Sequence, residues 1–207
     1  MAFRHLARRV PEAAHVVRLL GAFLAAAGPG VGLAALASAM RKDPAAVFSD
    51  LGPAADPRER EARRQAGLAI AIHRRLLRHL PAEVALAAMR PLLAAGGLAF
   101  LASALSDLSP EALARATTET LGPRVRGWLD RFATAKAEVV EASPGRVVFD
   151  VHACALVRLC AAARHPELAP LFCESDAAFF PHRGVRLDRP TTLATGGPRC
   201  RFILTPA

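Results

Sequence analysis

The fold is decided at residues 138–154, which read EVVEASPGRVVFDVHAC. Valines gather on both sides of the Pro144–Gly145 pair, which is a two-residue turn signal. β-branched residues around such a turn predict a β-hairpin. Before residue 138, apolar residues recur at helical spacing over two thirds of the chain. The spacing of apolar residues therefore changes from a helical to a strand pattern at this point.

After the hairpin, the sequence predicts both helices and strands. Residues 154–164 return to helical spacing, and Pro166 begins a further helical segment. Two more strands are expected at about 184–193 and 199–204, joined through Gly196 and Gly197. The sequence predicts an α+β fold, in which an N-terminal helical framework precedes a small antiparallel sheet with helices inserted between its strands.

The framework contains an amphipathic helix over residues 58–80. Its predicted core stripe consists of leucine and isoleucine at every fourth position: Leu68, Ile72, Leu76 and Leu80. His73 and His79 lie six residues apart and cannot share a ligand, so we expect both at the surface or its boundary.

Further helices are expected from Pro81 to Leu105, from Pro110 to Leu121 and from Pro123 to about Ala135. Gly96 and Gly97 would permit close packing of the first of these. Trp128 and Phe132 should point from the last towards the core.

Residues 19–40 carry no charge and are long enough to span a bilayer. Gly28, Pro29 and Gly30 interrupt them, which favours two short helices joined by a turn, with a membrane anchor or leader as the alternative. We therefore divide the chain into an N-terminal helical segment, 1–56, and an α+β domain, 57–207. A cytoplasmic location is expected, with membrane association through residues 19–40 as the alternative.

The net charge of +9 does not by itself indicate a nucleic-acid partner. Only Lys42 and Lys136 are lysines, and arginines are spread along the whole chain. The densest basic cluster, residues 58–78, lacks the aromatic residues on which bases stack. We interpret it as a solvated helix face and expect no nucleic-acid binding. The chain also has no Tyr and few Ser, so catalysis would depend on Cys, His and carboxylates.

All four cysteines fall in the C-terminal strand-and-helix unit, without a C-x-x-C pair. Reduced thiols are expected. Cys173 follows Pro170, where we place a helix N-terminus, so its thiolate should be stabilised in the first helical turn. Asp176 lies on the same helix face and would act as a proton carrier or a metal ligand. Cys160 is expected to be inert core.

Three segments together carry a resemblance to a known family: 149–154 (FDVHAC), 166–176 (PELAPLFCESD) and 189–202 (RPTTLATGGPRCRF). In this order, residues 139–204 resemble the L-2-amino-thiazoline-4-carboxylic acid hydrolase family. The resemblance implies hydrolysis of a carbon–nitrogen bond in a cyclic amidine derived from an amino acid. Arg201 stands where the family usually has Asp, and Ala153 where a basic residue often precedes the first Cys.

The family motifs imply catalytic roles for Cys154, Cys173, Asp176 and Cys200, with Cys173 as the nucleophile. Substrate binding is assigned to four further residues: His152, Arg189, Thr192 and Gly196. Arg189 would hold the substrate carboxylate.

No cofactor or metal is expected for this covalent route. Two alternatives stay open. The first is a metal ion held by Cys154, Cys173, Asp176 and Cys200 that activates water. The second is a sensor module, related to 4-vinyl-reductase-type domains, that binds a small molecule without catalysis.

Overall fold

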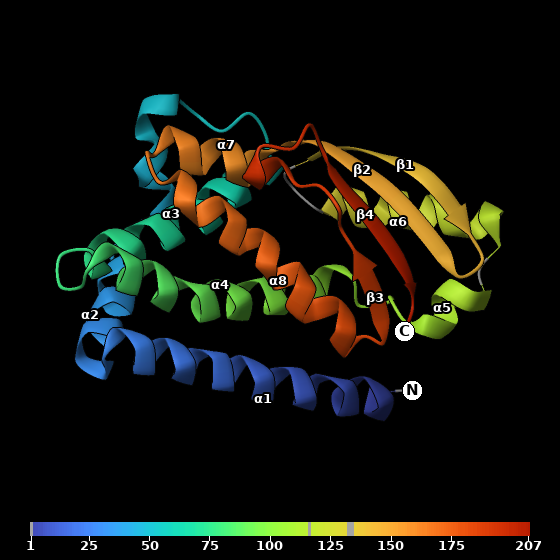
Figure 1. Cartoon of the computed structure of the whole chain (residues 1–207), viewed down its shortest axis with the longest axis horizontal. Helices are drawn as coiled ribbons and strands as arrows, with labels where there is room; N and C mark the ends of the chain where they lie inside the picture. Colours follow the sequence, from blue (N-terminus) through green and yellow to red (C-terminus); the bar gives the residue numbers. More distant parts are fainter. Residues whose placement is uncertain (1, 116, 132–134) are drawn as a thin grey trace.

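The computed structural model of the chain describes residues 2–115, 117–131 and 135–207. In these residues, helices form the N-terminal part and a four-stranded antiparallel sheet lies in the C-terminal part (Figure 1). Further helices connect the second strand to the third. The predicted α+β class is confirmed.

The sheet has the strand order β1-β2-β4-β3. Its strands are β1 (Ala135–Ser143), β2 (Arg146–Cys154), β3 (Val185–Asp188) and β4 (Cys200–Pro206). Gly145 adopts a φ of 75° between β1 and β2, a conformation that glycine reaches without steric cost. The predicted hairpin is therefore confirmed. The third strand is shorter than expected, because residues 189–199 form a loop with the 3-10 helix η3 (Leu193–Thr195).

The two faces of the sheet differ because successive side chains point to opposite sides. Phe149 pairs with Phe202, and Val151 pairs with Cys200, across β2 and β4. All four lie on the face that packs against the helices. The Phe149 and Phe202 rings stack there with centroids 4.6 Å apart. We call this the inner face of the sheet.

The N-terminal segment consists of α1 (Ala2–Ala27), α2 (Pro29–Met40) and the 3-10 segment η1 (Pro44–Leu51). The chain bends by 113° between Ala13–Ala27 of α1 and α2, and Gly28 at the bend has a φ of 77°. The predicted break is confirmed, although α1 is longer than expected. Phe23 and Ala35 are fully buried in a core shared with α3, α4 and α8.

Helix α3 (Pro57–Leu76) begins at Asp56, whose side chain accepts a hydrogen bond from the Glu59 amide. The predicted core stripe is partly wrong, since Leu68 is 37% exposed. The most closely packed face carries small residues instead. A Cβ atom on Gly67 would lie 1.9 Å from the Pro44 carbonyl oxygen, so the backbones of α3 and η1 touch there.

The arginine cluster is not entirely solvated, which corrects another expectation. The Arg63 side chain is buried and donates hydrogen bonds to Glu59 and to the Gly52 carbonyl oxygen. Glu59 also accepts from the Ala55 amide and from Arg158, and these bonds lower its pKa to about 2. Arg63 therefore contributes to the structure of the fold.

Helix α4 (Ala82–Ala104) continues through Pro91 and packs along α8 (Ala169–His182). A Cβ atom on Gly97 would come within 2.3 Å of the Ser175 side chain. The predicted close packing is thus confirmed at Gly97. At Gly96, an added Cβ would meet no atom within 4 Å, so the expectation fails there.

Helices α5 (Pro110–Arg115) and α6 (Thr118–Arg131) follow. The predicted boundary at Pro123 is wrong, because Pro123 lies inside α6. The hydroxyl groups of Thr117 and Thr120 each accept the other residue's backbone N–H, which caps the helix before residue 118. Trp128 is buried as predicted, whereas Phe132 lies outside the described residues.

Three helical elements connect β2 to β3: α7 (Ala155–Ala162), the 3-10 turn η2 (Pro166–Leu168) and α8. The expected helical segments after residues 154 and 166 are confirmed. Leu159 and Cys160 of α7 are fully buried between α3 and α8, so Cys160 belongs to the core as predicted.

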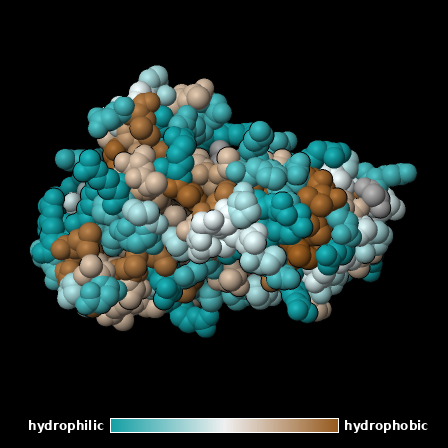
Figure 2. All heavy atoms as spheres, turned by 45° about the horizontal axis from the view of Figure 1, so that its top comes forward, coloured by the Kyte–Doolittle hydropathy of each residue, from teal (hydrophilic) through white to brown (hydrophobic). Residues whose placement is uncertain are grey.

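In length and composition, α4 could cross a membrane, and so could the bent pair formed by Ala13–Ala27 and Pro29–Met40. Of the apolar window in α4, 39% is buried within the protein. On the face drawn in Figure 2, hydrophobic groups form patches separated by hydrophilic ones. Membrane association through residues 19–40 stays a prediction.

Candidate functional site

A cavity of about 530 Å³ lies between the inner face of the sheet and helices α3, α4, α6 and α8. Its walls are mostly apolar and include the rings of Phe149, Phe202 and Trp128. Ligand sites in proteins commonly have this size and this apolar character, with a few polar groups that orient the ligand. The cavity is therefore the candidate site.

Polar groups that line the cavity come from β2, β4, α8 and α3, and α3 contributes Glu61 and Gln65. Cys154 ends β2, Cys200 begins β4, and Cys173 with Asp176 lies on α8. All four line the cavity. Their charges also influence one another, since Asp176, Cys154 and Cys200 each raise the pKa of the Cys173 thiol. The four residues that the family motifs single out thus lie at one place.

Asp176 is the carboxylic acid of this group. Its side chain is 18% exposed, and burial raises its pKa to about 6 although the adjacent Arg189 opposes the rise. Arg189 donates one hydrogen bond to Asp176 and another, of 2.8 Å, to the Cys173 carbonyl oxygen. An acid that titrates near neutral pH can carry a proton in either direction.

The thiol of Cys173 is not in the environment that we expected. Helix α8 begins at Ala169, so Pro170 is its second residue and Cys173 lies beyond the first turn. Its backbone amide is not among the free N–H groups of the helix end. Burial raises the pKa of Cys173 to about 12, although the charge of Arg189 opposes this rise. The prediction of a thiolate stabilised by the helix terminus is wrong for Cys173.

Cys154 occupies the helix-terminal position instead. It is the N-cap residue of α7, where the backbone N–H groups of Val157 and Leu156 lower the pKa of its thiol. Burial outweighs this effect and raises the pKa overall. Burial also raises the pKa of the Cys160 thiol, to about 12.

The loop before β4 contacts two of the thiols. The Thr192 hydroxyl lies 4.0 Å from the Cys173 sulfur, and the Leu193 amide donates to the Cys200 sulfur over 3.1 Å. Gly196 ends η3 with a φ of 84° and does not line the cavity. Gly196 therefore shapes the loop, and its predicted contact with the substrate is not supported by the structure.

His152 lies on the opposite face of the sheet from the cavity, which corrects its assignment to substrate binding. It is exposed and contacts Glu138, with 3.1 Å between Nε2 and Oε1. On the same face, Arg201 forms a two-pronged pair with the buried Asp150, over 2.7 and 2.8 Å. Arg199 adds a third contact of 3.2 Å, and these arginines lower the pKa of Asp150. We call this the outer face.

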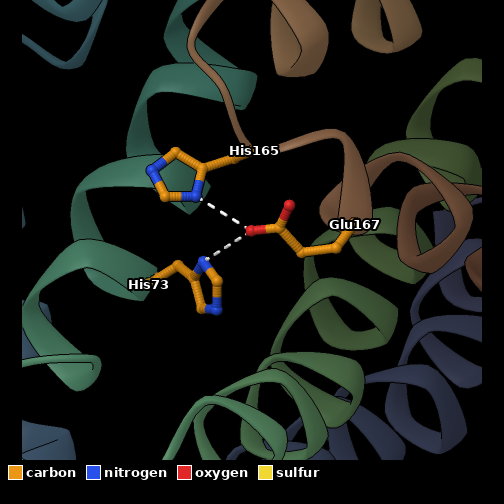
Figure 3. A group of neighbouring side chains, drawn as sticks. All are labelled: His73, His165 and Glu167. Atoms are coloured by element: carbon orange, nitrogen blue, oxygen red, sulfur yellow. Dashed lines mark hydrogen bonds and ion pairs between the residues drawn. The ribbon is translucent and has the colours of Figure 1, made fainter.

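A second group of ionisable residues surrounds Glu167 (Figure 3). Both His73 and His165 direct Nδ1 towards the same carboxylate oxygen, at 3.6 and 2.9 Å. His73 is only 2% exposed, and burial lowers its pKa. The expectation of a surface His73 is wrong, because η2 and His165 fold over this face of α3. Arg74 donates to Nε2 of His165, so His165 presents its Nδ1–H to Glu167.

The distances between possible ligand atoms bear on the metal alternative. Among the described residues, two groups of three have ligand atoms within 4.8 Å of one another: His73 with His165 and Glu167, and Glu138 with Asp150 and His152. The cavity cysteines and Asp176 do not form such a group. Their arrangement gives the metal alternative no geometric support.

The fold and the cavity define a small α+β domain with a mostly apolar pocket that three thiols line. Residues 60–204 match the family described as L-2-amino-thiazoline-4-carboxylic acid hydrolase, and the chain belongs to that family. The match begins well before the motif segments and includes α3, α4 and α6. No curated protein and no solved structure gives a significant match.

The residues that line most of the cavity were not recognised from the sequence as part of a site. The sequence places Trp128 only in the core, and it places Phe149 and Phe202 only within the predicted strands and the motif segments. The alternation of apolar residues along β2 and β4 could have placed Phe149, Val151 and Phe202 on the same face as Cys200.

Proposed function

We propose that the protein hydrolyses a carbon–nitrogen bond of a cyclic amidine in this cavity, with Cys173 as the nucleophile. The observation that carries the proposal is the convergence of Cys154, Cys173, Cys200 and Asp176 on one mostly apolar pocket. The family to which the chain belongs supplies the reaction class.

In the first step, the Cys173 sulfur adds to the amidine carbon of the ring. Because burial holds the pKa of this thiol at about 12, it needs a base as the bond forms. Asp176 is mostly ionised at neutral pH and takes the thiol proton. It then gives this proton to the ring nitrogen, and the exocyclic amino group gives a second proton to the same nitrogen as the carbon–nitrogen bond breaks. The nitrogen leaves as an amine, and the amidine carbon stays attached to Cys173 as an imine.

In the second step, water replaces the enzyme sulfur. The water oxygen adds to the same carbon while Asp176 accepts a proton. The carbon–sulfur bond to Cys173 then breaks, and the proton returns to that sulfur. The net change is the addition of one water across the ring carbon–nitrogen bond, and no redox partner is needed. Arg189 acts as a positioning residue, because it holds both Asp176 and the Cys173 carbonyl oxygen.

The departures from the family pattern fit this proposal. Arg201 points to Asp150 on the outer face, so the acid that the family usually has there would not reach the cavity. Ala153 is exposed and does not line the cavity either. Neither departure removes a group from the proposed machinery.

The proposal is tested by incubating the full chain with 2-amino-thiazoline-4-carboxylate and with 2-amino-thiazoline, and by following the ring-opened products by mass spectrometry. Rapid quenching should reveal a covalent adduct on the peptide that contains Cys173. A Cys173→Ala variant cannot form this adduct, so turnover by that variant would contradict the mechanism. Binding of either compound without ring opening would favour the sensor alternative.

A further inference from the structure

The cavity is large for the ring that the family name implies. Its volume of about 530 Å³ suits a drug-sized ligand, since such sites measure about 300–1,000 Å³. A five-membered ring with an amino group and a carboxylate would contact only the thiol-bearing wall. The remaining walls extend along α2, α3, α4 and α6 and are apolar except for Glu61 and Gln65 on α3.

The charges around the cavity also disagree with an anionic substrate. Of the described residues that line it, the only ones with charged side chains are Glu61 and Asp176, and both are acids. Arg189 lies nearby but does not line the cavity. Its guanidinium bonds Asp176 and the Cys173 carbonyl oxygen and lies over the Phe202 ring, 5.3 Å from its centroid. A substrate carboxylate would thus enter an apolar pocket without a free cationic partner, which is costly.

We propose that the cavity takes an elongated, largely apolar molecule with a small neutral or cationic nitrogen head, in place of an aminothiazoline carboxylate. The head lies against Cys154, Cys173, Cys200 and Asp176. The tail runs between the helices towards Leu68 and Met40, which both line the cavity and are exposed at the surface. The choice of an amidine as head rests on the proposed function, whereas the tail and the exclusion of anions rest on the cavity walls.

Trp128 provides the readout. It is the single tryptophan of the chain, is 2% exposed and lines the cavity, so a ligand that fills the cavity should change its fluorescence. The probes are 2-amino-thiazolines that carry no chain, a butyl chain or an octyl chain at ring carbon 4. Decanoate and 2-amino-thiazoline-4-carboxylate serve as anions with and without a long chain.

We expect affinity to rise by roughly fourfold for each methylene that enters the cavity, as apolar transfer predicts. Decanoate and the carboxylated ring should each bind at least about tenfold more weakly than the octyl amidine. The inference is overturned if chain length has no effect, or if either anion binds as tightly as the octyl amidine. This series uses the wild-type chain and does not depend on whether any variant folds.

A variant locates the tail. Gly96 lines the cavity, and a side chain there has free space around its Cβ, so Gly96→Leu should occupy part of the tail region. We expect it to weaken octyl amidine binding by about tenfold or more and to weaken binding of the chain-free amidine much less. Gly127→Leu is the matched control, because Gly127 is also helical and unobstructed but does not line the cavity. Equal effects of the two variants would contradict the placement of the tail.

Ring-opening assays on the same compounds separate this inference from the proposed function. If the octyl amidine binds tightly but is not opened, the cavity inference stands and the hydrolase proposal fails. If 2-amino-thiazoline-4-carboxylate is opened efficiently and chains bring no gain in affinity, the hydrolase proposal stands and the cavity inference fails.

Discussion

The inner and outer faces of the sheet are formed by alternate residues of the same two strands, yet their chemistry differs completely. On the inner face, Phe149 and Phe202 stack beside Cys200 and the cavity. On the outer face, Asp150 and Arg201 form an ion pair across β2 and β4. A shift of one position along a strand therefore separates residues of the candidate site from residues that only stabilise the sheet.

The largest expected effect lies on the inner side. Cys173→Ala should lower turnover of any opened amidine by about 10³-fold or more, since it removes the group that forms the covalent bond. Steady-state kinetics on the folded variant checks this. Cys160→Ala is the control, because Cys160 is fully buried away from the cavity and should lose only some stability. Similar losses of turnover in both variants would show that the cavity thiols have no special role.

The next effect is a pH dependence set by Asp176. Its pKa is raised to about 6, and the proposed mechanism needs it ionised. kcat/KM should therefore fall about tenfold for each pH unit below about 6. The pH–rate profile measures this directly. Asp150→Asn should leave the acid limb unchanged, because the pKa of Asp150 is lowered and its side chain lies on the outer face.

Stability should respond to pH in opposite directions at these two acids. The raised pKa of Asp176 means that its ionisation costs stability as the pH rises from its ordinary value of 3.8 to about 6. The lowered pKa of Asp150 means that its contribution is present above 3.8 and is lost as the pH falls through its lowered pKa. Urea denaturation of the wild type and of the Asp176→Asn and Asp150→Asn variants from about pH 2 to pH 7 covers both changes. The same sign for both would refute the assignment.

The outer ion pair offers a test by charge reversal. Arg201→Asp, which introduces the usual family residue, places two acids side by side and should cost about 1–3 kcal/mol of unfolding free energy. Adding Asp150→Arg should restore a large part of that loss. Both variants should retain the wild-type kcat. Increased activity in Arg201→Asp would mean that the outer face communicates with the cavity after all.

A smaller difference should appear among the thiols themselves. We expect iodoacetamide to modify Cys154 several-fold faster than Cys173, because helix N–H groups stabilise the Cys154 thiolate. Cys160 should react last, since it is fully buried. Peptide mapping over a short time course gives the order. If Cys173 reacts first, its thiol is more acidic than its buried position implies.

The smallest expected effect is at His152. His152→Ala should change neither turnover nor stability beyond about 0.5 kcal/mol, because the side chain is exposed and contacts only the outer face. Parallel kinetics and thermal melts check this. A clear loss of turnover would show that the outer face takes part in catalysis, contrary to the assignment of the site to the inner face.

Local patterns predicted much of this architecture. The hairpin followed from the valines around Pro144–Gly145, and the break at Gly28 from a Gly-Pro-Gly run. His73 could not be placed correctly from the sequence, because η2 and His165 bury it, and these residues lie about 90 positions further along the chain. The start of α8 shows the same limit, because whether Pro170 occupies the first or second helical position changes the surroundings of Cys173.

At position 97, the structure limits the size of the side chain strictly. Ser175 lies between Cys173 and Asp176 on α8, and its side chain faces Gly97 so closely that a single added methyl carbon would overlap it at 2.3 Å. Any larger residue at position 97 would push α8 outward and carry the nucleophile and the proton carrier with it. Displacements of about 1 Å in such groups can lower rates by about 100-fold. A random screen for inactive chains should therefore recover substitutions at position 97 alongside those of the thiols, although Gly97 has no chemistry of its own.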